Sequence, residues 1–200
     1  VLLRDAGHAV AGVKRSPGGM PDGVEGVRAD LADPASIAAA LASIEGPIDV
    51  SVCAVAADAG YDGAYRCAYV EGNRNLLAAL RARGPLPRHV FCTSSTAVYA
   101  QDDGSWVDEA SETTPRDFRG ARMLEAERVL SESGAPATVL RLGGIYGPGR
   151  TRLIESVRGG HARIAPGPPR FGNRIHSDDA ACALAHIVGM ALLGDALPPI

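Results

Sequence analysis

The sequence predicts an α/β fold, a doubly wound parallel sheet with helices on both faces. Short β-rich segments alternate along the chain with longer segments of helical character, which is the pattern of βαβ units. The segment 47–57 is a continuous apolar run, as expected of a strand that a parallel sheet buries on both faces. With 200 residues, of which 46% are hydrophobic, the chain can bury one sizeable core.

The first half of the chain has clear helix boundaries. Gly7 is a C-cap for the first helical segment, and Asp33 followed by Pro34 is a typical helix start. Gly84 and Pro85 prevent a helix from continuing. The elements expected here are a helix end at 1–5, strands at 8–13 and 26–30, a helix at 34–43, the strand at 47–57 and a helix at 62–83.

The second half continues the same alternation and then loosens after residue 151. Gly134 ends one helix, and Ser177 is the expected N-cap of the last one, with Asp178 and Asp179 well placed in its first turn. The elements expected are a strand at 88–95, a polar loop at 101–117, a helix at 118–132, a strand at 137–147, irregular chain at 165–173 and a helix from 177.

The order of these elements suggests an incomplete sheet. A doubly wound sheet normally opens with a strand and a Gly-rich turn, whereas this sequence opens with a helix end. We therefore expect about 20 further residues ahead of Val1, the length of a strand, a turn and half a helix. The chain reads as a fragment, with one domain at 1–150 and the start of a smaller lobe at 151–200.

Composition excludes several classes of function. A net charge of -3 gives no support for nucleic acid or membrane partners, and the longest apolar run is too short to span a bilayer. No cleavable signal pattern is present. The five histidines form no ligand pair at helical spacing, so no metal site is expected. The four cysteines lack CxxC spacing and indicate a reducing, cytoplasmic setting: Cys53, Cys67, Cys92 and Cys182.

Five segments in a fitting order carry a family resemblance: RADLADPASIAAAL (28–41), EGNRNLLAAL (71–80), TSSTAVYA (93–100), RLGGIYGPGR (141–150) and NRIHSDDAA (173–181). Together they resemble the extended short-chain dehydrogenase/reductase family, the NAD-dependent epimerase/dehydratase group. The resemblance implies a Rossmann-like NAD(P)-binding domain at 1–150 and part of a substrate-binding lobe at 151–200.

The resemblance implies a cofactor site at the ends of the early strands. Lys14 and Arg15 lie where the family faces the 2′-phosphate of NADP, so NADP is favoured over NAD; the alternative is a solvated strand end. Asp30 matches the residue that accepts a hydrogen bond from the adenine amino group, and Leu31 the residue that packs on the ring. The alternative for Asp30 is that it only precedes a helix.

Later strand ends imply further cofactor contacts. Ala54, Val55 and Ala56 correspond to small residues that let the backbone approach the ribose and phosphates, although plain core packing predicts the same residue types. Gly143 and Ile145 correspond to the chain that passes the nicotinamide carboxamide in the family.

Ser95 is the leading candidate for a catalytic group. The resemblance gives it the hydrogen bond to the reacting hydroxyl or carbonyl, and open α/β sheets bind ligands at the carboxyl ends of their strands. The alternative is a serine that only caps the strand end. Thr96 is a neighbouring substrate contact. Arg174 could bind a substrate phosphate or carboxylate, or equally tie down irregular chain.

The family's Tyr-x-x-x-Lys pair is replaced by Phe118 and Arg122, so the chain resembles an atypical member. One helical turn puts both residues on one face. Phe118 has no proton to exchange, whereas Arg122 can still hold the cofactor ribose. The proton donor is left unassigned; candidates are Tyr99, Tyr146, Asp117 and Glu112.

The resemblance implies an NAD(P)-dependent epimerase, dehydratase or reductase. It would act by hydride transfer on a small polar hydroxyl- or carbonyl-bearing substrate, such as a nucleotide sugar, and could pair into a homodimer. The alternative, favoured by Phe118, is a catalytically inactive NADP-binding sensor or scaffold.

Overall fold

The computed structural model describes residues 1–164, 166–167 and 171–197. Every strand pairing within them is parallel, which confirms the predicted fold class. The main piece of sheet has the order β3 (Val50–Cys53), β4 (His89–Ser95), β5 (Ala137–Leu142). A second piece pairs β1 (Ala11–Lys14) with β2 (Glu25–Arg28).

Side chains alternate across β4, and this alternation builds a core on each face of the sheet. Val90 and Cys92 point into one apolar cluster and Phe91, between them, into the other. The Val90 cluster is covered by α2 (Pro34–Ser43), α4 (Gly72–Arg83) and α5 (Phe118–Ser131).

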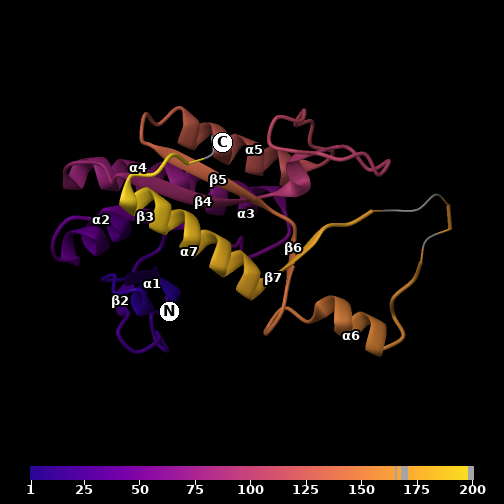
Figure 1. The fold of residues 1–200 in the computed structure, drawn as a ribbon, viewed down its shortest axis with the longest axis horizontal. Helices are drawn as coiled ribbons and strands as arrows, with labels where there is room; N and C mark the ends of the chain where they lie inside the picture. Colours follow the sequence, from indigo (N-terminus) through magenta and orange to yellow (C-terminus); the bar gives the residue numbers. More distant parts are fainter. Residues whose placement is uncertain (165, 168–170, 198–200) are drawn as a thin grey trace.

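The opposite face is covered by α7 (Ser177–Leu193) and α1 (Leu2–Asp5). Val188 and Ala191 of α7 form one apolar cluster with Phe91, and Leu3 of α1 packs against it. Figure 1 shows α7 running along this face while α4 and α5 lie on the other. Helices on both faces of parallel strands make the sheet doubly wound.

A cavity of about 740 Å³ separates the two pieces of sheet. It is lined by Ala11 and Val13 from β1 and by Val50 and Val52 from β3, with Val188 of α7 at its wall. Within the described residues β1 pairs only with β2 on one side, and β3 only with β4. The strand expected ahead of Val1 stays a prediction.

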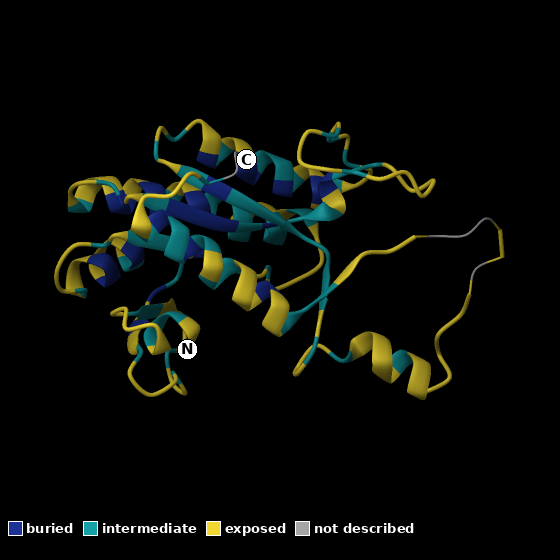
Figure 2. Ribbon diagram, viewed as in Figure 1, coloured by how far each residue is buried: buried dark blue, intermediate teal, exposed yellow. Residues whose placement is uncertain are grey.

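Residues after β5 leave the sheet before the chain returns to it. β6 (Gly144–Tyr146) pairs with β7 (Arg174–His176), and between them α6 (Arg152–Arg158) buries no residue. Figure 2 shows α6 as mostly exposed, whereas α7 carries the chain back to the buried core. The domain boundary expected at residue 150 stays a prediction.

Several element boundaries differ from those expected. The helix expected over 62–83 is broken into α3 (Asp62–Tyr65), the π-helical segment η1 (Arg66–Glu71) and α4. The strand expected over 137–147 is interrupted at Gly143. The run 47–57, expected to be a buried strand, gives only the four residues of β3, of which Cys53 is buried and Val52 is exposed.

The N-cap of α7 was predicted wrongly. Its N-cap is His176, whose Nδ1 accepts a 3.2 Å hydrogen bond from the backbone N–H of Asp178. Ser177 is instead the first helical residue. Of the irregular segment 165–173, residues 165 and 168–170 lie outside the described part of the chain. In that described part, no helix combines the length and apolar character that a membrane span requires.

Candidate functional site

The carboxyl ends of the strands bring polar side chains to one edge of the sheet. Arg15 follows β1, Asp30 follows β2, and Asp58 follows β3. Ser95 ends β4, and Gly143 follows β5. Because ligands of open parallel sheets bind at this edge, these residues form the candidate site.

Arg15 is bound to Asp58 by two hydrogen bonds. Nη1 donates to Oδ2 at 2.7 Å and Nη2 donates to Oδ1 at 2.5 Å. The hydrogen bond from Arg15 lowers the pKa of Asp58, and the same bond, with added attraction from Asp30, raises the pKa of Arg15. Lys14 is exposed beside it. Sequence reasoning missed Asp58, which no pattern distinguished.

The loop after β2 is held by hydrogen bonds. Asp30 Oδ1 accepts from the backbone N–H of Ala32 at 2.9 Å, and the Asp30 N–H donates to Ser36 Oγ at 3.1 Å. The carbonyl of Leu31 accepts from Asn75 Nδ2 at 2.8 Å. Asp30 and Leu31 therefore have fixed positions, and one carboxylate oxygen of Asp30 has a backbone partner.

Small side chains follow β3 at the same edge. Ala54 and Ala56 are exposed and Val55 is half-buried. The Ala57 N–H donates to the Tyr69 hydroxyl at 3.3 Å, and burial raises the pKa of Tyr69. This segment offers an accessible backbone, as the approach of a dinucleotide would require.

Ser95 and Thr96 lie beside two later segments of the chain. Ser95 Oγ accepts from the Ala97 N–H at 3.2 Å and caps the 3-10 turn η2 (Thr96–Val98). Thr96 Oγ1 donates to Asn173 Oδ1 at 3.2 Å, and a Cβ on Gly143 would lie 3.2 Å from the Asn173 side chain. The structure therefore brings the predicted Thr96 and Gly143 against Asn173, which sequence reasoning missed, and Ser95 directly precedes Thr96 at the end of β4.

The first turn of α5 is packed directly against the chain after Ser95. A Cβ on Gly120 would lie 2.7 Å from Pro115 Cβ and would overlap the Ala97 carbonyl oxygen. Asp117 is the N-cap of α5 and accepts from the Arg119 and Gly120 N–H groups at 2.9 and 3.2 Å. Burial acts to raise the pKa of Asp117, but these hydrogen bonds outweigh it and lower that pKa. Asp117 is therefore a helix cap held in its ionised form.

Phe118, which is predicted to take the position of the family's Tyr, belongs to an aromatic group. Its ring packs edge-on against Tyr65, with centroids 5.5 Å apart, and Tyr65 lies 5.3 Å from Tyr69. The Arg119 guanidinium covers Phe118 at 4.9 Å. Tyr65 was missed at the sequence level, although the spacing of four between Tyr65 and Tyr69 places both on one helical face.

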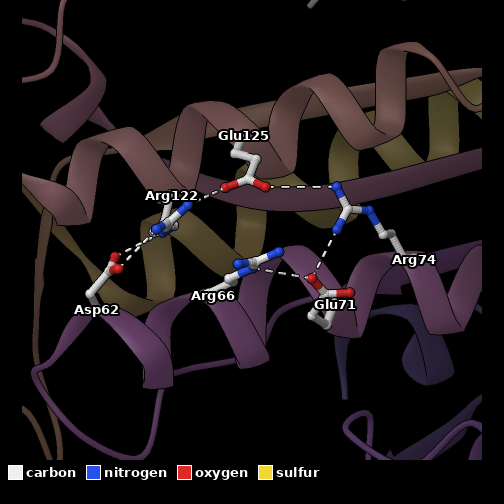
Figure 3. Close-up of polar contacts among 6 residues, drawn as sticks. All are labelled: Asp62, Arg66, Glu71, Arg74, Arg122 and Glu125. Carbon is white, nitrogen blue, oxygen red and sulfur yellow. Dashed lines mark hydrogen bonds and ion pairs between the residues drawn. The ribbon is translucent and has the colours of Figure 1, made fainter.

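Arg122 is engaged by carboxylates in this structure. Nε and Nη2 each donate to Asp62 at 2.8 Å, and Nη1 donates to Glu125 at 2.6 Å. Glu125 also pairs with Arg74 of α4, at 3.7 Å. Figure 3 shows the whole network between α3–α4 and α5, formed by Asp62, Arg66, Glu71, Arg74, Arg122 and Glu125. All three guanidinium nitrogens of Arg122 thus have partners, so a ribose contact would require exchange of at least one.

A buried polar network joins the carboxyl end of β4 to α5 and β5. Glu127 is 5% exposed and pairs with Arg141 at 2.8 Å. Ser94 Oγ donates to Glu127 at 2.6 Å, and Arg141 Nη1 donates to the Tyr99 hydroxyl at 2.9 Å. That hydroxyl donates in turn to the Asp108 carbonyl at 2.8 Å. Tyr99 therefore anchors the polar loop, and its hydroxyl has two partners.

The remaining candidates lie on β6, β7 and the polar loop. Tyr146 is 41% exposed and its ring centroid lies 5.2 Å from that of His176. The Arg174 guanidinium lies against Gly144, where a Cβ would approach its Cζ to 3.1 Å. Ile145 is half-buried and pairs in register with Ile175. The Glu112 side chain is exposed. In the described ranges, no three His, Cys, Asp or Glu side chains gather as metal ligands.

The fold and the edge described above define a doubly wound α/β protein of the Rossmann type. The sequence profile of the NAD dependent epimerase/dehydratase family matches residues 1–187, and the chain belongs to this family. The predicted family is thereby confirmed.

Several known proteins are similar to this chain. The 2-alkyl-3-oxoalkanoate reductase of Stenotrophomonas maltophilia (strain K279a) is 30% identical over 204 residues, which cover 96% of this chain and 60% of the reductase. A candidate NAD-dependent epimerase/dehydratase from Methylobacillus flagellatus is 38% identical, with a TM-score of 0.75 over 94% of this chain and 64% of that one. MoeE5, solved with UDP-glucose and NAD, is 26% identical, with a TM-score of 0.69 over 91% of this chain and 64% of that one. The chain therefore spans about three fifths of the length of its curated relative.

Proposed function

We propose that the protein is an NAD(P)-dependent epimerase, dehydratase or reductase that acts by hydride transfer on a small polar hydroxyl or carbonyl substrate. The observation that supports this proposal is the position of Ser95 at the carboxyl end of β4, next to Thr96, which bonds Asn173, in a chain of this family. A hydroxyl at this place is suited to hydrogen-bond a reacting oxygen.

The residues at the edge fit a nicotinamide dinucleotide. We propose that Arg15 and Lys14 face the adenosine ribose, that Asp30 and Leu31 hold the adenine, and that Ala54 to Ala56 admit the phosphates. The exposed small side chains after β3 and the cation after β1 support this arrangement. A cation at the end of β1 favours NADP over NAD, since it can pair with the 2′-phosphate.

The bound cofactor would supply or accept a hydride at its nicotinamide. In the proposal Ser95 Oγ donates a hydrogen bond to the substrate oxygen, which requires only that its present contact, an accepted bond from Ala97, be kept or exchanged. The chain at Gly143 and Ile145 would lie beside the nicotinamide carboxamide. Arg122 adds positive charge near the start of α5. It would reach the cofactor ribose by releasing the carboxylate of Asp62 or Glu125.

The proton that must accompany hydride transfer needs a donor, because Phe118 has none. Tyr65 carries a phenol directly against the Phe118 ring. We therefore extend the proposal to Tyr65 as the proton donor and acceptor, in place of the phenol that the family carries at position 118. Tyr99 is less suited, since its hydroxyl already has two partners in the loop network.

The relatives support a range of substrates. The Stenotrophomonas relative is a 2-alkyl-3-oxoalkanoate reductase, which favours a carbonyl substrate. MoeE5 was solved with UDP-glucose, which favours a nucleotide sugar, and Arg174 could then bind a phosphate. A homodimer stays part of the proposal.

Calorimetric titration of the intact protein with NADP and then with NAD tests the proposal. Saturable binding of either dinucleotide, followed by substrate-dependent change in nicotinamide absorbance, would support an enzyme. Ser95→Ala should abolish turnover and leave dinucleotide binding in place, since Ser95 is assigned to the substrate. Absence of binding to both dinucleotides would refute the proposed function.

A second candidate function is a catalytically inactive NADP-binding sensor or scaffold, and Phe118 is the observation that favours it. It predicts tight NADP binding without turnover for any carbonyl or hydroxyl substrate tried. Turnover that depends on both Ser95 and Tyr65 would exclude it.

A further inference from the structure

The Arg15–Asp58 ion pair joins two segments that no strand pairing connects in the part of the chain that the structure describes. The residues are 43 positions apart and follow β1 and β3, which belong to separate pieces of sheet. Both terminal guanidinium nitrogens of Arg15 are used, and both carboxylate oxygens of Asp58 accept. The two side chains are 58% and 66% exposed, so the pair is accessible to a ligand at this edge.

A phosphate binds a guanidinium through the same two-point arrangement that a carboxylate uses. The face of Arg15 that could receive a 2′-phosphate is therefore filled by Asp58 in this structure. A ligand phosphate and the Asp58 carboxylate compete for one guanidinium, and only one of them can have the two-point contact.

We propose that Asp58 determines the selectivity between NADP and NAD by competing with the 2′-phosphate for Arg15. This inference rests on the proposed function, since it requires that a nicotinamide dinucleotide bind at this edge. NAD carries no 2′-phosphate and leaves the Arg15–Asp58 pair intact. NADP must displace Asp58, and part of the attraction of Arg15 for the phosphate is lost in that exchange.

Asp30 also disfavours NADP relative to NAD, and it does so without leaving its place. Its carboxylate is close enough to attract Arg15, yet one of its oxygens is held by the backbone N–H of Ala32. It is thus a fixed negative charge near the place of the 2′-phosphate. Asp58, which is held only by Arg15 among the described residues, is the carboxylate that can leave.

Binding constants of four forms of the intact protein test the proposal: wild type, Asp58→Asn, Arg15→Gln and the double variant. Calorimetry with NADP and with NAD gives each constant. Asp58→Asn should tighten NADP binding by about two- to fivefold, the range expected for an exposed ion pair, and change NAD binding by less than twofold. In the Arg15→Gln background the same substitution should have no effect on the ratio, because the competition has been removed.

Asp49→Asn is the matched control. Asp49 pairs with Arg88 at 3.3 Å, is also exposed, and lies at the amino end of β3 rather than the carboxyl end. Asp49→Asn removes one negative charge, as Asp58→Asn does, but at the opposite edge of the sheet. It should leave the ratio of the NADP and NAD binding constants unchanged. Thermal unfolding of each variant shows whether the fold is retained.

The outcomes separate the two proposals. If the wild type binds dinucleotides and Asp58→Asn leaves the NADP-to-NAD ratio unchanged, the competition is refuted while the proposed function stands. An equal gain in the Arg15→Gln background would also refute it, because the effect would then come from removal of a charge and not from release of Arg15. If no form binds either dinucleotide, the proposed function fails and this inference fails with it.

Discussion

The guanidinium of Arg122 binds the carboxylate of Asp62 through two hydrogen bonds of 2.8 Å each. The pair joins the N-terminal half of α5 to the first turn of α3 (Figure 3). Arg122 is predicted to lie where the family carries the lysine of its catalytic pair. In this chain the same position has become part of the contact between two helices, and the planar guanidinium suits that contact because its donors form a fixed fork.

The Arg122–Asp62 pair should make stability depend on pH in the acid range. The hydrogen bond from Arg122 lowers the pKa of Asp62, so its stabilisation is present above the unfolded pKa of about 4 and is lost as the pH falls through the lower folded value. Asp62→Asn should flatten the fall in melting temperature over this range. Asp22→Asn, an exposed carboxylate in the loop before β2, is the control. Equal slopes for wild type and Asp62→Asn would contradict the assignment.

Gly120→Ala should destabilise the protein by about 1–3 kcal/mol, the usual cost of overpacking. The added Cβ would overlap the Ala97 carbonyl oxygen, so α5 must move away from the chain that follows Ser95. Gly189→Ala is the matched control, since that helical glycine has open space around it and alanine is the better helix former by about 1 kcal/mol. Denaturant unfolding should show that the two variants change the free energy of unfolding in opposite directions. If Gly120→Ala left this free energy unchanged, α5 would not be packed as closely against the chain after Ser95 as described.

Glu127→Ala should cost about 3 kcal/mol of the free energy of unfolding, because it leaves the Arg141 charge without its carboxylate in a setting that is 15% exposed. Arg88→Ala breaks an exposed ion pair with Asp49 and should have a small effect. Chemical denaturation measures both. If the two variants lost similar stability, the buried network would not be the support of β4 that its geometry indicates.

Phe118→Tyr together with Arg122→Lys should create or raise slow redox turnover in the intact protein, since it restores the pair that the family uses. The Asp62 carboxylate can hold a lysine as well, so the lysine should reach the ribose more readily when Asp62→Asn is added. Turnover is followed by nicotinamide absorbance. No gain in any of these variants would count against the placement of positions 118 and 122.

Tyr65→Phe should lower kcat by about 100-fold or more while KM changes little, if Tyr65 is the proton donor that replaces position 118. The basic limb of the pH–rate profile should disappear with it, which loss of packing alone would not cause. Tyr61→Phe, on the same stretch of chain but 63% exposed, should behave as wild type. A normal pH profile in Tyr65→Phe would assign the proton step elsewhere.

Much of the fold could be predicted because local patterns specify it. The apolar run before Ala54 marks a strand, although Cys53 is its one buried residue, and Asp33 with Pro34 marks the start of α2, where Asp33 does accept from the Ala35 N–H. Local patterns failed where packing decides the outcome. No local pattern marks the interruption at Gly143 or the π-helical turn before Gly72; the two glycines lie against Asn173 and Leu31, which are distant in sequence.

The sequence by itself determined the fold class and the family, since these follow from hydrophobic periodicity and from motifs read in order. It also predicted Ser95, Phe118 and Arg122 as candidate site residues. Only the tertiary structure decided which partners those residues have. Arg15 meets Asp58, and Arg122 meets Asp62, across 43 and 60 positions of chain. Charge pairing acts through space over a few ångströms, and no pattern in a linear sequence records which distant carboxylate the fold will bring that close.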